Sequence, residues 1–309
     1  MQPLTIALGN YGLTRPLKDG TVKPRLPLDY VAVEPITAAM RRMVRGLDFD
    51  ISEMAFTTYL CAKALGKPIT AIPVFLTRNF HHWAAFVHAE SGIKSPKDLE
   101  GRRVGVNRGY TVTTGLWVRG ILQHEYGVDL RGITWLATDE EHVAEYKAPA
   151  NVEYLRGKNA AELLLSRQCD AAIGDVRTDS PVVRPLIPDA RAAGFAYFRK
   201  TGVYPINHGV VVKSALLAAN PSLAADLFAA FKAAKEIYLR ELHEGSARTP
   251  ADDQARRLTE VVSGDPFPFG IKDNRKAIDT IVDFAVEQQV IPRRLSIEEL
   301  FAPGTLELA

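Results

Sequence analysis

Two kinds of apolar pattern alternate along the chain. Short apolar runs predict strands, and segments with an apolar residue every three or four positions predict helices. The expected strands are 4–8, 28–33, 49–54, 69–75, 83–88, 103–107, 133–137 and 170–175, with further extended segments at 195–198 and 210–212. The expected helices are 36–44, 56–65, 95–99, 113–126, 160–167, a long one from Leu223 to Leu242, and 277–290 before a polar tail. This alternation is typical of an α/β fold with mostly parallel sheets flanked by helices.

The strands and helices form two series, and the second series is inserted into the first. We expect one discontinuous lobe from residues 1–86 and 206–309 and an inserted lobe from residues 87–205. The chain then crosses between the lobes near 82–92 and 196–210. A double crossing makes a hinge, so a ligand cleft is expected between the lobes, at the carboxyl ends of the strands.

The composition is that of an ordinary globular protein, with 309 residues, 47% apolar and 24% charged. A net charge of +2 gives no reason to expect a nucleic-acid partner. No apolar run reaches the roughly 18 residues of a membrane span, so no membrane partner is expected. The first eight residues lack the basic and apolar regions of a signal peptide, which predicts a cytoplasmic protein unless a leader was removed. Cys61 and Cys169 are expected to be buried free thiols.

The segment 104–115 is a strand that runs into a glycine- and threonine-rich turn and opens a helix. Free N–H groups at a helix start, with hydroxyls and a guanidinium beside them, suit a carboxylate or a phosphate. The alternative is that the threonines only cap the helix. The turn lacks the Gly-Lys-Ser/Thr of a nucleotide-binding loop. The candidate ligands here are Asn107, Arg108, Tyr110, Thr111 and Thr113.

A second cluster, residues 77–83, follows the strand 69–75. The guanidinium of Arg78 can bind a carboxylate in a bidentate manner, and the rings of Phe80, His81 and His82 suit a planar ligand. Adjacent histidines on an extended segment point to opposite faces, so one of them is expected to face the ligand, and a metal pair is disfavoured. The alternative is a polar hinge surface.

Other candidates also lie near strand ends. Glu53 can donate or relay a proton if burial raises its pKa, although Ser52 beside it can equally cap the next helix. His208, on the second crossing, can act as an acid or base opposite His82, or be structural. Asn10 and Tyr11 are candidate wall residues of the ligand site.

Asp175 and Arg177 also follow a strand, and a surface ion pair is the alternative for them. The chain contains neither a Gly-x-Ser-x-Gly elbow nor a His-Glu-x-x-His helix, so hydrolysis by either route is unsupported.

At these residues the chain resembles the 4,5-dihydroxyphthalate decarboxylases, a family with the type II periplasmic-binding-protein-like fold. The resemblance covers the chain to about residue 245. It is carried by Ile51-Ser52-Glu53-Met54, Ile72-Pro73-Val74-Phe75 with Arg78, Phe80 and His82, the segment 117–128, and the segment 199–208. Relatives often have an acidic Pro-Glu-Tyr type sequence where this chain has 107–110, and a cation there favours a doubly charged ligand such as a phthalate. His81 likewise replaces what is often arginine.

The resemblance implies cofactor-independent decarboxylation of 4,5-dihydroxyphthalate to 3,4-dihydroxybenzoate and carbon dioxide in phthalate catabolism. The chemistry needs no metal in principle, and assistance by a divalent metal and another hydroxylated phthalate as substrate stay open as alternatives. Arg78 and Arg108, with the region 111–113, are then expected to hold the carboxylates. His82 or His208 is expected to take the phenolic proton, and Glu53 or the other histidine to deliver one to carbon. Cytosolic relatives imply a homo-oligomer.

The rival interpretation is a non-catalytic solute-binding protein that delivers a small aromatic carboxylate to an ABC transporter, which requires export. A regulator's sensor is disfavoured because no DNA-binding segment is attached.

Overall fold

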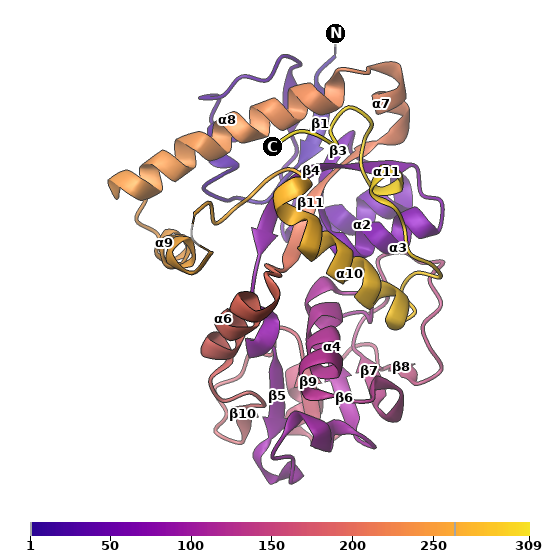
Figure 1. The fold of residues 1–309 in the computed structure, drawn as a ribbon. Helices are drawn as coiled ribbons and strands as arrows, with labels where there is room; N and C mark the ends of the chain where they lie inside the picture. The colour runs from indigo at the N-terminus through magenta and orange to yellow at the C-terminus, as the bar shows by residue number, and fades with distance from the viewer. Residues whose placement is uncertain (1, 263) are drawn as a thin grey trace. The chain divides into compact units, whose positions relative to one another are not determined.

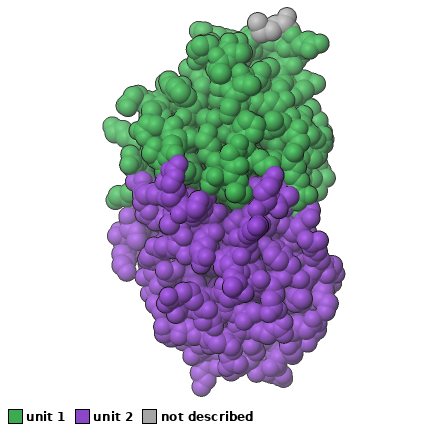
Figure 2. Space-filling view, turned by 90° about the vertical axis from the view of Figure 1, so that its right-hand side faces the viewer, with its two compact units in different colours: residues 1–78, 206–278, 295–309 green, residues 79–205, 279–294 purple. Residues whose placement is uncertain are grey.

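The computed structural model describes residues 2–262 and 264–309, and the chain divides into two compact units (Figure 1). Unit 1 contains the chain up to residue 78 with 206–278 and 295–309, and unit 2 contains 79–205 and 279–294 (Figure 2). The sequence assigned 79–86 and 279–294 to the first lobe, but their contacts place them in unit 2. For 279–294 the reason is the ring of Phe284, which packs against Trp117 of unit 2.

The sheet of unit 1 has five strands in the order β2-β1-β3-β11-β4. β1 pairs in parallel with β2 and β3, whereas β11 is antiparallel to both of its neighbours. One strand thus runs against the other four, and the expectation of a mostly parallel sheet is confirmed. The strands are β1 (Leu4–Ala7), β2 (Leu28–Tyr30), β3 (Ile51–Ala55), β4 (Ile69–Arg78) and β11 (Ile206–Lys213).

The long helix α8 supplies much of the core of unit 1. Leu223, Leu227, Phe231, Tyr238 and Leu242 form its buried apolar stripe, as the sequence predicted. The helices of this unit are α1 (Arg15–Lys18), α2 (Ile36–Gly46), α3 (Phe56–Ala64), α7 (Ser214–Ala219), α8 (Leu223–Glu244), α9 (Pro250–Val262), α11 (Ile297–Leu300) and the 3₁₀ turn η5 (Lys272–Asn274). Across the described chain, no helix combines the length and apolar character that crossing a membrane requires.

Unit 2 has a six-stranded sheet in the order β10-β5-β9-β6-β7-β8, in which only β5 runs against the others. Its strands are β5 (Ala85–His88), β6 (Arg103–Val106), β7 (Thr134–Ala137), β8 (Val152–Tyr154), β9 (Ala171–Ile173) and β10 (Val183–Pro185). Its helices are α4 (Thr113–Tyr126), α5 (Ala160–Leu165) and α6 (Ala190–Thr201), and α10 (Arg275–Glu287) begins in unit 1 and continues here. Short 3₁₀ turns complete it: η1 (His81–Trp83), η2 (Ala89–Ser91), η3 (Pro96–Leu99) and η4 (Leu130–Gly132).

Two local predictions were wrong. Residues 195–198 lie in helix α6 rather than in an extended segment, because the side chain of Asp189 caps the helix start and Gly202 ends it in the left-handed region. The tail after α10 is not simply polar. Leu300 and Phe301 are buried in unit 1, and the hydroxyl of Tyr59 donates to the carbonyl of Leu300.

A substitution at Gly120 tests how closely helix α4 packs against helix α10. A Cβ there would lie 2.0 Å from Cδ2 of the Phe284 ring. We therefore expect Gly120→Ala to lower the free energy of unfolding by about 1–3 kcal/mol, because the ring must move. Urea denaturation followed by tryptophan fluorescence measures this, since all three tryptophans lie in unit 2. The matched control is Gly132→Ala, where the nearest atoms are 4.0 Å away, and an equal loss in both variants would contradict the packing argument.

Candidate active site

A buried carboxylate lies in the sheet of unit 1. Glu53 is in the middle of β3, and its side chain is fully buried. It accepts hydrogen bonds from the N–H of Gly9 at 2.8 Å, the hydroxyl of Tyr11 at 2.8 Å and Nδ1 of His208 at 2.6 Å. Gly9 and Tyr11 follow β1, and His208 is near the start of β11. Because β1 and β11 flank β3 and β11 is antiparallel, these groups meet at one sheet edge.

The hydrogen bond to Glu53 fixes the protonation of the His208 ring. An ionised carboxylate only accepts, so Nδ1 is the ring nitrogen that donates, and a neutral ring then has its lone pair at Nε2. Within the described residues, Nε2 makes no hydrogen bond, and 16% of the side chain is exposed. An imidazole held in this way by a carboxylate can act as a general base.

Hydrogen bonds within the loop after β1 hold Tyr11 next to the Glu53 carboxylate. A Cβ on Gly9 would lie 2.5 Å from the Tyr11 ring, so the ring lies directly over the glycine backbone. Thr14 closes the loop, because its hydroxyl accepts from the N–H of Tyr11 at 3.0 Å and donates to the carbonyl of Gly9 at 2.9 Å. Burial, with Glu53 beside it, raises the pKa of Tyr11, so its hydroxyl stays protonated.

Lys18, which no sequence motif marks, lies beside this loop. Its Nζ donates to the carbonyl of Leu8 and to Oδ1 of Asn10, both at 2.7 Å. Burial lowers the pKa of Lys18. The exposed Asn10 also donates to Glu34 at 3.4 Å, so the predicted wall residue connects a cation and an anion.

In unit 2, the glycine- and threonine-rich turn after β6 already holds a carboxylate, that of Glu141. Glu141 accepts from the N–H of Tyr110 at 2.6 Å and from the N–H and hydroxyl of Thr111 at 3.0 and 2.5 Å. The hydroxyl of Tyr154 donates to it at 2.7 Å. A Cβ on Gly109 would lie 2.7 Å from this carboxylate. The turn binds a carboxylate, but this carboxylate belongs to the protein itself, so two of the amides expected to bind a ligand are not free.

Arg119 of α4 holds the same turn from the carbonyl side. It is fully buried, with Cζ 3.8 Å from the centre of the Tyr110 ring. Its Nη2 donates to the carbonyl of Tyr110 at 2.7 Å and its Nε to Gln288 at 2.8 Å. Burial lowers the pKa of Arg119. A guanidinium on the carbonyl and a carboxylate on the N–H thus fix the Tyr110 backbone from both ends.

Arg108 has an unusual backbone at the start of this turn. Its φ is +71°, in the left-handed region, which costs a residue other than glycine roughly 1 kcal/mol or more. Thr138 holds this backbone, because its hydroxyl accepts from the N–H of Arg108 at 2.8 Å and its own N–H donates to the Arg108 carbonyl at 3.0 Å. Strained backbones held in this way are frequent at binding sites.

The remaining residues of the turn have structural partners. Asn107 donates to the carbonyl of Asp175 at 3.1 Å. Thr113 is buried in the first turn of α4, but the N-cap residue is Val112, so a threonine does not cap the helix. Asp175 and Arg177 form an exposed ion pair at 2.7 Å, which is the surface pair given above as the alternative.

The side chains of Arg78 and Phe80 are engaged within their own units. Arg78, in unit 1, donates to the carbonyl of Pro268 at 3.2 Å and to the side chain of Asn274. Phe80, in unit 2, packs in an aromatic cluster with Phe195, Phe198 and Tyr204.

The adjacent histidines do not alternate across an extended segment, because residues 81–83 form the turn η1. His81 is buried and stacks on Trp117. His82 has a fully buried side chain whose Nε2 lies 2.7 Å from Oε2 of Glu125. Both rings are therefore part of the packing of unit 2.

Glu141, Glu125 and Arg119 were not singled out from the sequence. Glu141 ends the acidic stretch 139–141, which is typical of a solvated surface, and Glu125 and Arg119 lie on a helix with other polar residues. Their partners are far away in sequence: 30 positions separate Glu141 from Thr111, and 43 separate Glu125 from His82. No local motif can reveal such pairs.

Comparison with known proteins identifies the family. The family model described as "NMT1/THI5 like" matches residues 46–241. A 4,5-dihydroxyphthalate decarboxylase from Comamonas testosteroni is 31% identical over 98% of this chain and 97% of its own length. The chain belongs to the 4,5-dihydroxyphthalate decarboxylase family. A second 4,5-dihydroxyphthalate decarboxylase, from Pseudomonas putida, is 34% identical over 63% of this chain and 81% of that protein.

The fold of this decarboxylase-family chain is that of periplasmic binding proteins. The periplasmic aliphatic sulphonate-binding protein SsuA of Escherichia coli has a TM-score of 0.57 and 14% identity, covering 97% of this chain and 92% of its own. The predicted family and the predicted two-lobed type II fold are thereby confirmed. In the described part of the chain, no three His, Cys, Asp or Glu side chains are grouped so that they could hold a metal ion.

The carboxylate of Glu141 can be tested by an isosteric change. Glu141→Gln places an amide NH₂ against N–H donors, so we expect the free energy of unfolding to fall by about 1–3 kcal/mol. Urea denaturation with tryptophan fluorescence reports on unit 2, which contains the turn. Glu153→Gln, at a side chain that is 55% exposed, is the control and should change little. Equal stability of the two variants would mean that the cradle does not need the charge.

Proposed function

We propose that this chain is a carboxy-lyase that converts 4,5-dihydroxyphthalate to 3,4-dihydroxybenzoate and carbon dioxide. Relatives that bear the name of this activity support the proposal. The observation that carries it is the buried Glu53 carboxylate, which holds His208 with Nε2 unbonded in the described chain. This pair supplies the base that the reaction requires.

The chemistry needs a base and an acid. In 4,5-dihydroxyphthalate each hydroxyl lies para to one carboxylate, so removing its proton raises the electron density at the para carbon. That carbon then accepts a proton. The bond to the carboxylate breaks, carbon dioxide leaves, and the electron pair of that bond restores the aromatic ring with a phenolate oxygen. The phenolate is reprotonated, so one proton is taken up from solvent per turnover.

The hydrogen bonds of unit 1 provide a path for these protons. Nε2 of His208 takes the phenolic proton, and the Nδ1 proton moves to Glu53. Protonated Glu53 then donates to Tyr11 as the hydroxyl proton of Tyr11 moves to the ring carbon. This leaves the His208 proton on Nε2 instead of Nδ1, and exchange with solvent returns it to Nδ1 before the next turnover. Oε1 of Glu53 accepts from both Tyr11 and His208, so a single oxygen joins the two ends of the path.

We assign the binding of a substrate carboxylate to Arg108, in the turn after β6, and to Thr113, the first residue of α4. Guanidinium groups bind carboxylates strongly, and a helix start favours anions. The strained backbone of Arg108 supports a role in binding. Arg78 and His82 receive no role in this proposal, because Arg78 is held by Asn274 and His82 by Glu125.

The rival function is a binding protein for a small aromatic carboxylate, which the fold shared with SsuA favours. We propose the enzyme because a binding protein has no need of a base held by a buried carboxylate. We also propose a cytoplasmic location, since both cysteines are free and buried, as is typical of proteins in a reducing compartment.

His208→Asn tests the base. Asparagine leaves a side-chain N–H in reach of Glu53 and removes Nε2, so we expect kcat to fall by about 10²–10⁴-fold with little change in KM. Chelator-treated protein is incubated with 4,5-dihydroxyphthalate, and the ultraviolet spectrum is followed for 3,4-dihydroxybenzoate.

The control for this test is His243→Asn, at an exposed histidine near the end of α8, which should keep the wild-type kcat. Full turnover by His208→Asn would remove His208 as the base. Saturable binding of 4,5-dihydroxyphthalate without turnover by the wild type would favour the binding protein instead.

Arg108→Gly removes the guanidinium without adding backbone strain. Glycine adopts φ near +71° without strain, and relief of about 1 kcal/mol of strain offsets stability that is lost with the Arg108 side chain. Loss of the guanidinium should raise KM by about 10-fold or more. Gln289→Gly, at an exposed residue with φ +58°, is the matched control and should leave KM unchanged. An unchanged KM in Arg108→Gly would be evidence against Arg108 as a substrate ligand.

A further inference from the structure

The loop that carries Tyr11 is pressed against an aromatic ring of helix α8. Tyr238 is buried, and a Cβ on Gly12 would lie 2.1 Å from Cε2 of its ring. No side chain fits between this ring and the loop backbone, so the position of the ring determines how far the loop can move. Gly12 is next to Tyr11 in the chain, and displacement of one displaces the other.

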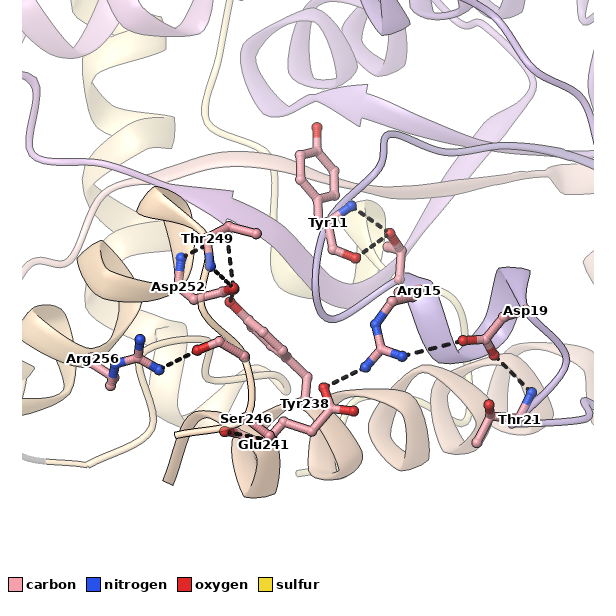
Figure 3. A network of polar contacts seen from close by, with 12 residues as sticks. Tyr11, Arg15, Asp19, Thr21, Tyr238, Glu241, Ser246, Thr249, Asp252 and Arg256 are labelled. Carbon is pink, nitrogen blue, oxygen red and sulfur yellow. Dashed lines mark hydrogen bonds and ion pairs between the residues drawn. The ribbon is translucent and has the colours of Figure 1, made fainter. Parts of the chain in front are cut away.

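A hydrogen bond to helix α9 holds the Tyr238 ring in place (Figure 3). The hydroxyl of Tyr238 donates to Oδ1 of Asp252 at 2.6 Å. The other oxygen of Asp252 accepts from the N–H and hydroxyl of Thr249 at 2.7 and 2.8 Å. Although burial acts in the opposite direction, the hydrogen bonds from Tyr238 and Thr249 lower the pKa of Asp252, so it stays ionised.

A second contact ties the end of the same loop to α8. Arg15, the first residue of α1, donates to Glu241 of α8 and to Asp19 at 3.3 Å (Figure 3). The N–H of Arg15 also donates to the carbonyl of Tyr11 at 2.9 Å. Arg15 is half-exposed, and exposed ion pairs contribute little energy, so the buried ring of Tyr238 is the stronger constraint.

We propose that Tyr238, held by Asp252, is a positioning residue for Tyr11. Its ring fixes the backbone of Gly12, and this keeps the hydroxyl of Tyr11 at hydrogen-bond distance from Glu53. Proton transfer depends steeply on such distances, and a displacement of about 1 Å can cost 10²-fold in rate. The proposal rests on the proposed function, in which Tyr11 delivers the proton to carbon.

A double-mutant cycle tests the link in turnover. Tyr11→Phe removes the hydroxyl, and Tyr238→Leu removes the ring that positions it. We expect Tyr238→Leu to lower kcat about 10-fold with little change in KM, and to have no further effect in the Tyr11→Phe background. Effects that multiply in the double variant would overturn the proposal.

The control for lost packing is Phe228→Leu. Phe228 is another buried aromatic residue of α8, which packs on Phe269, and this variant should keep the wild-type kcat. Tyr238→Phe keeps the ring against Gly12 and loses the bond to Asp252, so its kcat should lie between those of the wild type and Tyr238→Leu. A Phe228→Leu variant that loses kcat as Tyr238→Leu does would mean that general packing explains the loss.

Hydrogen exchange gives a readout that needs no turnover. Tyr238→Leu should speed exchange of the amides in 9–14 by at least about 5-fold, while the amides of β1 keep the wild-type rate. Unchanged exchange in 9–14 would overturn the proposal whatever the activity. If the wild type fails to turn over 4,5-dihydroxyphthalate, the proposed function fails, and exchange alone decides whether Tyr238 positions the loop.

Discussion

The hydrogen bonds to the buried Glu53 carboxylate are the constraint on which the arrangement of unit 1 depends. An ionised carboxylate without compensating donors is very costly inside a protein. The donors here come from the loop after β1 and from β11, on the two sides of β3. Loop 9–14 must therefore close over the sheet edge, and β11 must pair with β3 in the register that sets His208 opposite Ala55.

Unit 2 contains a second buried carboxylate, that of Glu141. Its hydrogen bonds hold a turn of the backbone in place. Hydrogen bonds to Glu141 come from the backbone N–H groups and a hydroxyl of one turn, and from the hydroxyl of Tyr154 in β8. The result is a fixed turn rather than a proton path. Arg119 completes it by donating to the carbonyl of Tyr110. A turn whose sequence predicts anion binding can therefore bind a carboxylate of the protein itself instead of a ligand.

The two carboxylate–histidine pairs differ in which partner, the imidazole or the carboxylate, is exposed to solvent. His82 with Glu125 and His208 with Glu53 have nearly the same separation, 2.7 and 2.6 Å. In the first pair the imidazole is fully buried and the carboxylate is partly exposed, whereas in the second the imidazole is partly exposed and the carboxylate is buried. Only the second arrangement leaves part of the imidazole exposed while its carboxylate partner stays out of water.

The sequence by itself determined the α/β class, the stripe of α8, the start of α4 and its end at Gly127, because these follow from local periodicity and turn chemistry. It also marked Tyr11 at the end of the first strand, Glu53 at the end of the strand expected at 49–54, and His208 on the second crossing. Only the tertiary structure decided that Glu141 fills the cradle and that His82 is buried. These outcomes depend on which side chains meet across 30 or more positions, and such meetings are set by packing rather than by any local pattern.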